Sequence, residues 1–147
     1  MRIVSAFAAV VIFALGTTAV SSQQDPIAAR KALMKSNGQA AGSLAKMVKG
    51  EAPFDLPTTQ KAFATFKDAA AKMPALFPDN SKTGGETTAA PKIWEDTADF
   101  KARFVKLGSD AKAASASIKD LDSLKKAFPD FGKNCAGCHE LYRINKS

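Results

Sequence analysis

The most reactive side chains of the chain lie near its C-terminal end, in the run Cys135, Ala136, Gly137, Cys138 and His139. Two thiols three positions apart can each form a thioether with a vinyl group of haem, and the adjacent imidazole can then reach the iron. A histidine nitrogen is an ordinary axial ligand of haem iron. The C-x-x-C-H spacing therefore predicts one covalently attached haem c, with Cys135 and Cys138 as thioether residues and His139 as an axial iron ligand.

Three other uses of the cysteine pair fit the sequence less well. A thioredoxin-like dithiol is expected within a β-α-β segment, and the flanking sequence indicates none. Structural zinc takes four ligands, whereas the chain has only two Cys and one His. A disulfide across two intervening residues would be strained if the segment is helical. Haem attachment is the interpretation that uses all three side chains.

The first 22 residues have the composition of a secretory signal peptide. Arg2 supplies the positive start, residues 3–15 are apolar but too short to span a membrane comfortably, and small residues precede Gln23. We expect cleavage before Gln23 and a single mature domain over residues 23–147, with a retained membrane anchor as the alternative. Covalent haem attachment in bacteria occurs outside the cytoplasmic membrane. We therefore expect a periplasmic protein of a Gram-negative bacterium with no stable membrane anchor.

The chain is mildly basic, with a formal charge of +7 that falls to +6 when Arg2 leaves with the signal peptide. A basic surface can steer an acidic redox partner. Nucleic acid is not expected as a partner, because the lysines are scattered and no recognition motif is present. We expect redox proteins with acidic surfaces as partners. The sequence leaves open whether two copies pair as a homodimer.

The mature part is rich in Ala and Lys, and its apolar residues recur at helical spacing. We expect four helices, at about 26–49, 58–72, 91–117 and from 121 toward 145, the last kinked at Pro129 and Gly132. Residues 79–90 are polar and Gly-rich, which predicts a mobile loop. Each helix carries one apolar stripe. The pattern predicts an all-α, antiparallel four-helix bundle with the haem near the C-terminus of the last helix.

A second axial ligand can be sought by its level in the bundle. The helical rise places His139 about 9 Å from its helix end and Met34 about 12 Å from the start of the first helix, so the two levels agree. Met47 lies roughly 20 Å further along and is expected in the core, and Met73 immediately precedes a proline. Met34 is therefore the candidate second ligand, although it could instead only pack against the ring. Small residues that leave room for a flat ring follow it at Gly38, Ala41 and Gly42.

Segments 49–55, 91–94 and 133–139 resemble those of the class II c-type cytochromes, the cytochrome c′ family, over the whole mature chain. The resemblance implies a four-helix bundle with C-x-x-C-H near the C-terminus. Residues 33–38 (L-M-K-S-N-G) and 76–79 (L-F-P-D) are similar to the low-spin cytochrome c-556 branch, in which the Met of the first segment binds iron opposite His. The resemblance thus implies that Met34 ligates iron and that the protein transfers single electrons.

The same resemblance leaves a second function open. The high-spin branch binds nitric oxide or carbon monoxide at a five-coordinate iron, and some of its members also carry Met at this position. Arg30 matches a position at which an Arg of that branch approaches a haem propionate. Lys133 matches a basic residue beside the haem, and Trp94 and Phe100 could line the pocket or only pack in the core. We do not expect an enzyme, because the one His is committed to iron and no acid-base pair is evident.

Overall fold

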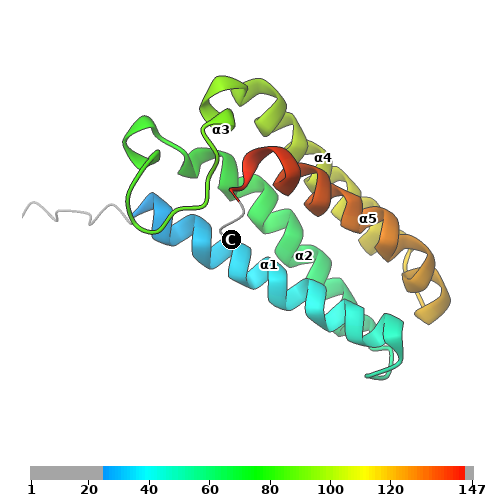
Figure 1. Cartoon of the computed structure of the whole chain (residues 1–147). Helices are drawn as coiled ribbons and strands as arrows, with labels where there is room; N and C mark the ends of the chain where they lie inside the picture. The colour runs from blue at the N-terminus through cyan, green and yellow to red at the C-terminus, as the bar shows by residue number, and fades with distance from the viewer. Residues whose placement is uncertain (1–24, 145–147) are drawn as a thin grey trace, which may run out of the picture.

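The computed structural model describes residues 25–144, so the expected signal peptide lies outside the described residues. Four long helices form an antiparallel bundle, which confirms the predicted all-α four-helix architecture (Figure 1). Within residues 25–144, no helix has the length and apolarity needed to cross a bilayer. The elements in chain order are α1 (Pro26–Lys49), α2 (Leu56–Lys72), the 3-10 turns η1 (Met73–Leu76) and η2 (Asp79–Ser81), α3 (Lys92–Glu95), α4 (Thr97–Ser117) and α5 (Leu121–Tyr142).

Capping interactions between neighbouring residues determine where α1 begins and ends and where α5 begins. The Asp25 carboxylate accepts a hydrogen bond from the Ile27 backbone N–H at 2.9 Å, which satisfies a donor that the first turn leaves free. Gly50 ends α1 in a left-handed conformation (φ 77°) that glycine adopts without strain. Asp120 forms a reciprocal capping box at the start of α5. The helix then continues without interruption through Pro129, and the expected kink stays a prediction.

Two expected helix boundaries were wrong for the same physical reason. Helix α2 begins at Leu56 rather than Thr58, because the Asp55 carboxylate caps it by accepting from the Thr58 N–H at 2.8 Å. The single helix expected over 91–117 is divided at Asp96, whose backbone is not helical (φ −127°, ψ 58°). Its carboxylate instead accepts from the Asp99 N–H at 3.3 Å and starts α4. In both places an Asp side chain competes with the helical backbone for hydrogen bonds.

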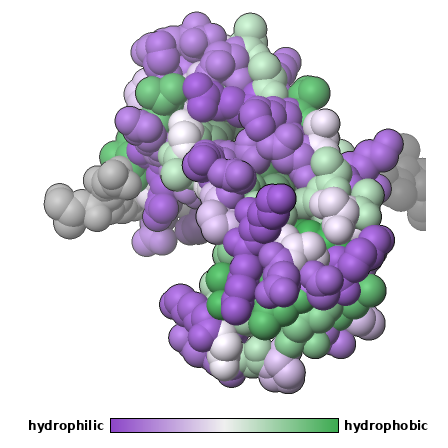
Figure 2. Space-filling model, turned by 90° about the vertical axis from the view of Figure 1, so that its right-hand side faces the viewer, coloured by the Kyte–Doolittle hydropathy of each residue, from purple (hydrophilic) through white to green (hydrophobic). Residues whose placement is uncertain are grey.

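Aromatic rings join α2 and α5 at the centre of the bundle. Phe63 and Phe66 of α2 lie with their ring centres 5.1 and 4.9 Å from that of Phe131 on α5. Met47 is 4% exposed, which confirms its expected place in the core. Helix α2 packs closely against both α1 and α4, and α5 packs more extensively against α4 than against α1. Figure 2 views the bundle end with the α1–α2 and α4–α5 connections, where hydrophilic side chains cover much of the surface.

The aromatic centre should dominate the stability of the bundle. We predict that Phe63→Ala lowers the free energy of unfolding by about 3–5 kcal/mol, because the 1% exposed ring leaves a cavity between α2 and α5. Urea unfolding of the purified protein would measure the change. The control is Val105→Ala, at a side chain that is 74% exposed, with an expected effect below about 0.5 kcal/mol. Equal losses in the two variants would contradict the assignment of the core.

Candidate functional site

The reactive residues of the C-x-x-C-H segment lie on the second half of α5, where helical spacing brings them to one side. Cys135 is exposed, whereas Cys138 and His139 are half-buried. Cys138 also packs against the hydrophobic core. No disulfide joins the two cysteines. The segment therefore stands at the boundary between core and surface, where a partly buried group could be held.

Burial controls the protonation of these side chains. It raises the pKa of the Cys135 and Cys138 thiols, since a thiolate is poorly solvated there. At Cys138 the positive charge of Arg103 opposes this rise, and the negative charge of Asp99 adds to it. Burial also lowers the pKa of His139, with a smaller contribution from Arg143. A neutral imidazole keeps a free nitrogen lone pair, which is the form that binds a metal.

Met34 is the one methionine among residues 25–144 that is not fully buried. It is half-buried on α1 and packs against the same core as Cys138, whereas Met47 and Met73 are 4% and 0% exposed. The C-terminal end of α5 lies near the start of α1 (Figure 1), and Met34 lies in the first half of α1. Met34 is therefore still the candidate second ligand. Iron ligation by this sulfur stays a prediction.

The residues that follow Met34 on α1 include two exposed glycines and one buried polar atom without a partner. The Asn37 Oδ1 atom, one turn further on, is buried and has no hydrogen-bond partner. Leaving such an oxygen unpaired costs about 1–3 kcal/mol. A Cβ atom added at Gly38 or Gly42 would meet nothing within 4 Å. With two thiols, a neutral imidazole and a thioether in this half of the bundle, the residues present fit a haem c.

Arg30 lies on α1 one turn before Met34 and is only 5% exposed. Its guanidinium donates hydrogen bonds to the Leu76 carbonyl (3.0 Å), to the Ser81 hydroxyl and carbonyl (both 2.9 Å) and to the Thr87 hydroxyl (2.7 Å). Burial lowers its pKa from the usual arginine value. The role of Arg30 in anchoring residues 76–87 could not be expected from the sequence, because its hydrogen-bond partners lie 46 to 57 positions away along the chain. Its expected propionate contact stays a prediction.

The other expected pocket residues fall into two environments. Trp94 donates from Nε1 to the Phe77 carbonyl at 3.0 Å, and the Phe77 ring lies 4.8 Å from that of Phe100. These three side chains form an aromatic cluster close to Arg30, whose guanidinium carbon is 4.6 Å from the Phe77 ring centre. Lys133 is exposed and pairs with Asp130 at 2.6 Å. Contact of any of them with haem is untested.

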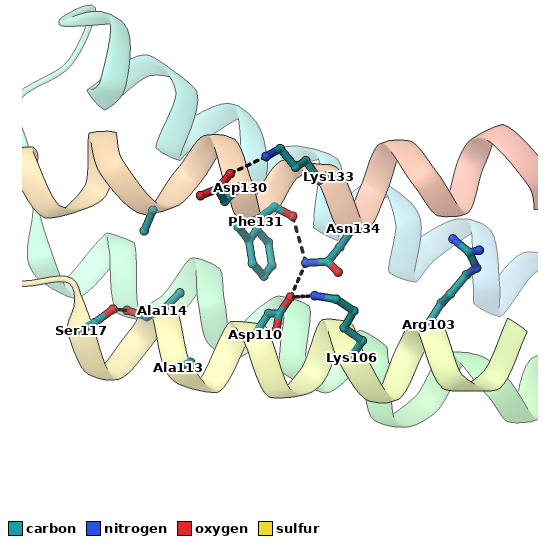
Figure 3. Close-up of a pocket in the computed structure, with 11 residues that line it drawn as sticks. Arg103, Lys106, Asp110, Ala113, Ala114, Ser117, Asp130, Phe131, Lys133 and Asn134 are labelled. Atoms are coloured by element: carbon teal, nitrogen blue, oxygen red, sulfur yellow. Dashed lines mark hydrogen bonds and ion pairs between the residues drawn. The ribbon is translucent and has the colours of Figure 1, made fainter. Parts of the chain in front are cut away.

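A groove of about 620 Å³ lies between α4 and α5 (Figure 3). Its lining includes Arg103, Asp110, Phe131 and Asn134, but none of the three reactive residues. The Asn134 amide crosses from α5 to α4 and donates to the Asp110 carboxylate at 2.8 Å. The groove therefore lies on the side of the attachment segment that faces away from the thiols. We expect the haem on the side that carries the thiols.

The bundle and its C-x-x-C-H segment define a c-type cytochrome of the four-helix class. The sequence profile described as Cytochrome C′ matches residues 25–143. The chain is 48% identical over 133 residues to a cytochrome c′ of Rhodopseudomonas palustris, which covers 90% of this chain and 91% of that protein. It is 42% identical to a cytochrome c-556 of Agrobacterium tumefaciens over 80% of this chain and 95% of that protein.

A solved structure of cytochrome c′ from Rhodopseudomonas palustris superposes with a TM-score of 0.82 at 50% identity, covering 85% of this chain and all of that one. The chain belongs to the cytochrome c′ family, which includes relatives named cytochrome c-556. Membership of this family means that the protein carries a covalent haem c with its iron. The relatives carry both names, so they do not separate the low-spin branch from the high-spin branch.

The hydrogen bonds of Arg30 make a prediction about the α2–α3 connection. Arg30→Met should destabilise it by about 2 kcal/mol or more, because the Ser81, Thr87 and Leu76 acceptors lose their donor. We expect faster hydrogen exchange at the Ser81 amide, which donates to the Pro78 carbonyl at 2.9 Å. The matched control is Lys31→Met, at an exposed neighbour of Arg30 paired with Glu86 at 3.7 Å. Equal exchange rates in the two variants would refute the anchoring role.

Proposed function

We propose that the protein is a periplasmic one-electron carrier whose low-spin haem c is attached at Cys135 and Cys138 and ligated by His139 and Met34. Haem iron, when bound, would accept and release a single electron by changing between two oxidation states. The remaining work is done by the chain, which holds the group, fills both axial positions and excludes water. The expected signal peptide over residues 1–22 supports export to the periplasm.

The position of Met34 carries the low-spin part of the proposal. It is the one incompletely buried methionine among the described residues, and it lies in the first half of α1, whereas His139 lies in the last turn of the antiparallel helix α5. Ligation by Met raises the reduction potential of haem iron relative to other ligand sets. With both axial positions filled, the ligand geometry need change little between oxidation states, which suits an electron carrier rather than an enzyme.

Surface properties support exchange with a protein partner. Cys135 is exposed, so the attached edge of the macrocycle would lie near the surface. The net positive charge of the chain favours encounter with an acidic redox protein. Such docking is expected to be weak and transient, as in other redox encounters.

A gas-binding role is the second candidate. A solved relative with a TM-score of 0.70 and 30% identity is a nitric oxide complex of a cytochrome c′ variant from Alcaligenes xylosoxidans. The 48% identical relative also bears the name cytochrome c′. In this alternative the iron is five-coordinate, and Met34 lines the pocket without binding the metal.

An absorption spectrum of the reduced protein before and after carbon monoxide distinguishes the two functions. We expect a low-spin spectrum that is indifferent to the gas, because Met34 occupies the position the gas would take. Met34→Ala should open that position and bind carbon monoxide at once. Met47→Leu, at a 4% exposed core position, should leave the spectrum unchanged. Immediate carbonyl formation by the unmodified protein would instead establish the gas-binding role.

The attachment residues make a separate prediction about folding. Replacing both Cys135 and Cys138 with Ser should yield a loosened bundle or no accumulated protein, because the apolar macrocycle would no longer complete the core. Haem content by intact mass and cooperativity of urea unfolding would be measured together. A haem-free double variant that unfolds cooperatively with unchanged stability would contradict this role.

A further inference from the structure

Helix α4 contacts the back of the attachment segment through Arg103. The Arg103 Nη1 atom donates to the Gly137 carbonyl at 3.0 Å, a link between residues 34 positions apart. Gly137 lies between the two cysteines of the C-x-x-C-H segment. A Cβ atom at Gly137 would stand 3.6 Å from the same nitrogen. The guanidinium therefore lies directly against the backbone that joins the thioether residues.

Two further side chains hold this guanidinium in place. Asp99, one turn earlier on α4, accepts from Arg103 Nε at 2.6 Å through Oδ2. The Tyr142 hydroxyl, from the end of α5, donates to the same oxygen at 2.6 Å. The Arg103 guanidinium carbon also lies 5.6 Å from the Tyr142 ring centre. One carboxylate thus joins the cation of α4 to the last turn of α5.

The protonation states of the network are stable near neutral pH. Burial and the hydrogen bond to Asp99 raise the pKa of Tyr142 to about 12, so its hydroxyl remains a donor. The hydrogen bonds from Tyr142 and Arg103 lower the pKa of Asp99, so the carboxylate remains charged. The network then consists of one cation, one anion and one neutral hydroxyl.

We propose that Asp99, Arg103 and Tyr142 form a positioning and charge-setting network for the haem of this protein. Arg103 fixes the backbone between the thioether residues, and the opposed charges of Arg103 and Asp99 set the electrostatic potential beside the group attached there. The inference rests on the proposed attachment at Cys135 and Cys138. It assigns to α4 a role that the haem-carrying helix cannot perform alone.

The direction of the electrostatic effect follows from charge alone. A cation beside the haem favours the reduced iron, which carries one positive charge less, and an anion favours the oxidised iron. Arg103 should therefore raise the reduction potential and Asp99 should lower it. The Arg103 side chain is 33% exposed and that of Asp99 42%, so salt should weaken both effects without removing them.

An ordinary helical ion pair serves as the comparison. Lys72 and Asp68 form an i,i+4 pair on α2 with an N···O distance of 2.8 Å, and both side chains are more than half exposed. Their pairing is local to α2, whereas Arg103 and Asp99 each also bond to α5. Charge removal at Lys72 or Asp68 therefore measures how far any surface charge alters the potential.

The experiment is an equilibrium redox titration of the purified haem-loaded protein at low salt. We expect a lower reduction potential for Arg103→Leu, a higher one for Asp99→Asn, and an intermediate value for the double variant. Arg103→Lys should stay closer to the unmodified protein than Arg103→Leu, because it keeps the charge. Lys72→Leu and Asp68→Asn should shift the potential less than the corresponding changes at Arg103 and Asp99.

Shifts no larger than those of the α2 controls would overturn the proposal, as would shifts of the same sign in Arg103→Leu and Asp99→Asn. Asp99→Asn keeps the size of the side chain, so the proposal remains testable even if Arg103→Leu fails to fold. Carbon monoxide binding by the unmodified protein would refute the carrier function alone, because opposite shifts at Arg103 and Asp99 are expected at any haem iron attached to this segment.

Discussion

The structure depends on how α5 is held against α2 and α4 while its two thiols lie at the boundary between core and surface. Phe131 packs into the aromatic centre formed with α2. Hydrogen bonds from Asn134 and to Gly137 tie α5 to α4 on either side of Cys135. Helix α5 packs less extensively against α1 than against α4. Because these contacts fix the helix, its reactive side chains are held at the boundary between core and surface, where a bulky group can bind.

Polar contacts organise the end of the bundle where the site lies. Arg30 joins α1 to residues 76–87, and the Tyr142 carbonyl accepts from the Ala90 N–H at 3.0 Å. A buried guanidinium is costly unless its donors are satisfied, and here four hydrogen bonds satisfy those of Nη1 and Nη2. The connection between α2 and α3 is thereby held over the start of α1, close to Met34. A defined ligand geometry at this end of the bundle requires that the α2–α3 connection and the start of α1 be held in fixed positions.

The sequence predicted the features that local chemistry determines. Cysteine attachment needs a fixed short spacing, so the C-x-x-C-H segment was visible without a structure. The helix ends at Asp25 and Gly50 were visible because capping involves neighbouring residues. The break at Asp96 was missed because an Asp can either continue a helix or cap a new one, and only packing decides between them.

Long-range polar contacts were beyond the reach of the sequence. Arg30 was singled out for an expected propionate contact, and nothing in the pattern indicated that Ser81 and Thr87 would accept from it. The link from Arg103 to the Gly137 carbonyl involves a backbone acceptor, which leaves no trace in the amino-acid types. The choice of Met34 as the candidate second ligand, by contrast, followed from the helical rise and the antiparallel order, and its ligation of iron stays a prediction.

The central claim is that the polypeptide alone does not complete this bundle and that a covalently held porphyrin does. Mass spectrometry of the intact protein, purified from the periplasm without reduction or chelation, tests it most directly. The account predicts a single species with the mass of the chain from Gln23 onward plus one haem. A well-folded exported chain with no added macrocycle would contradict it.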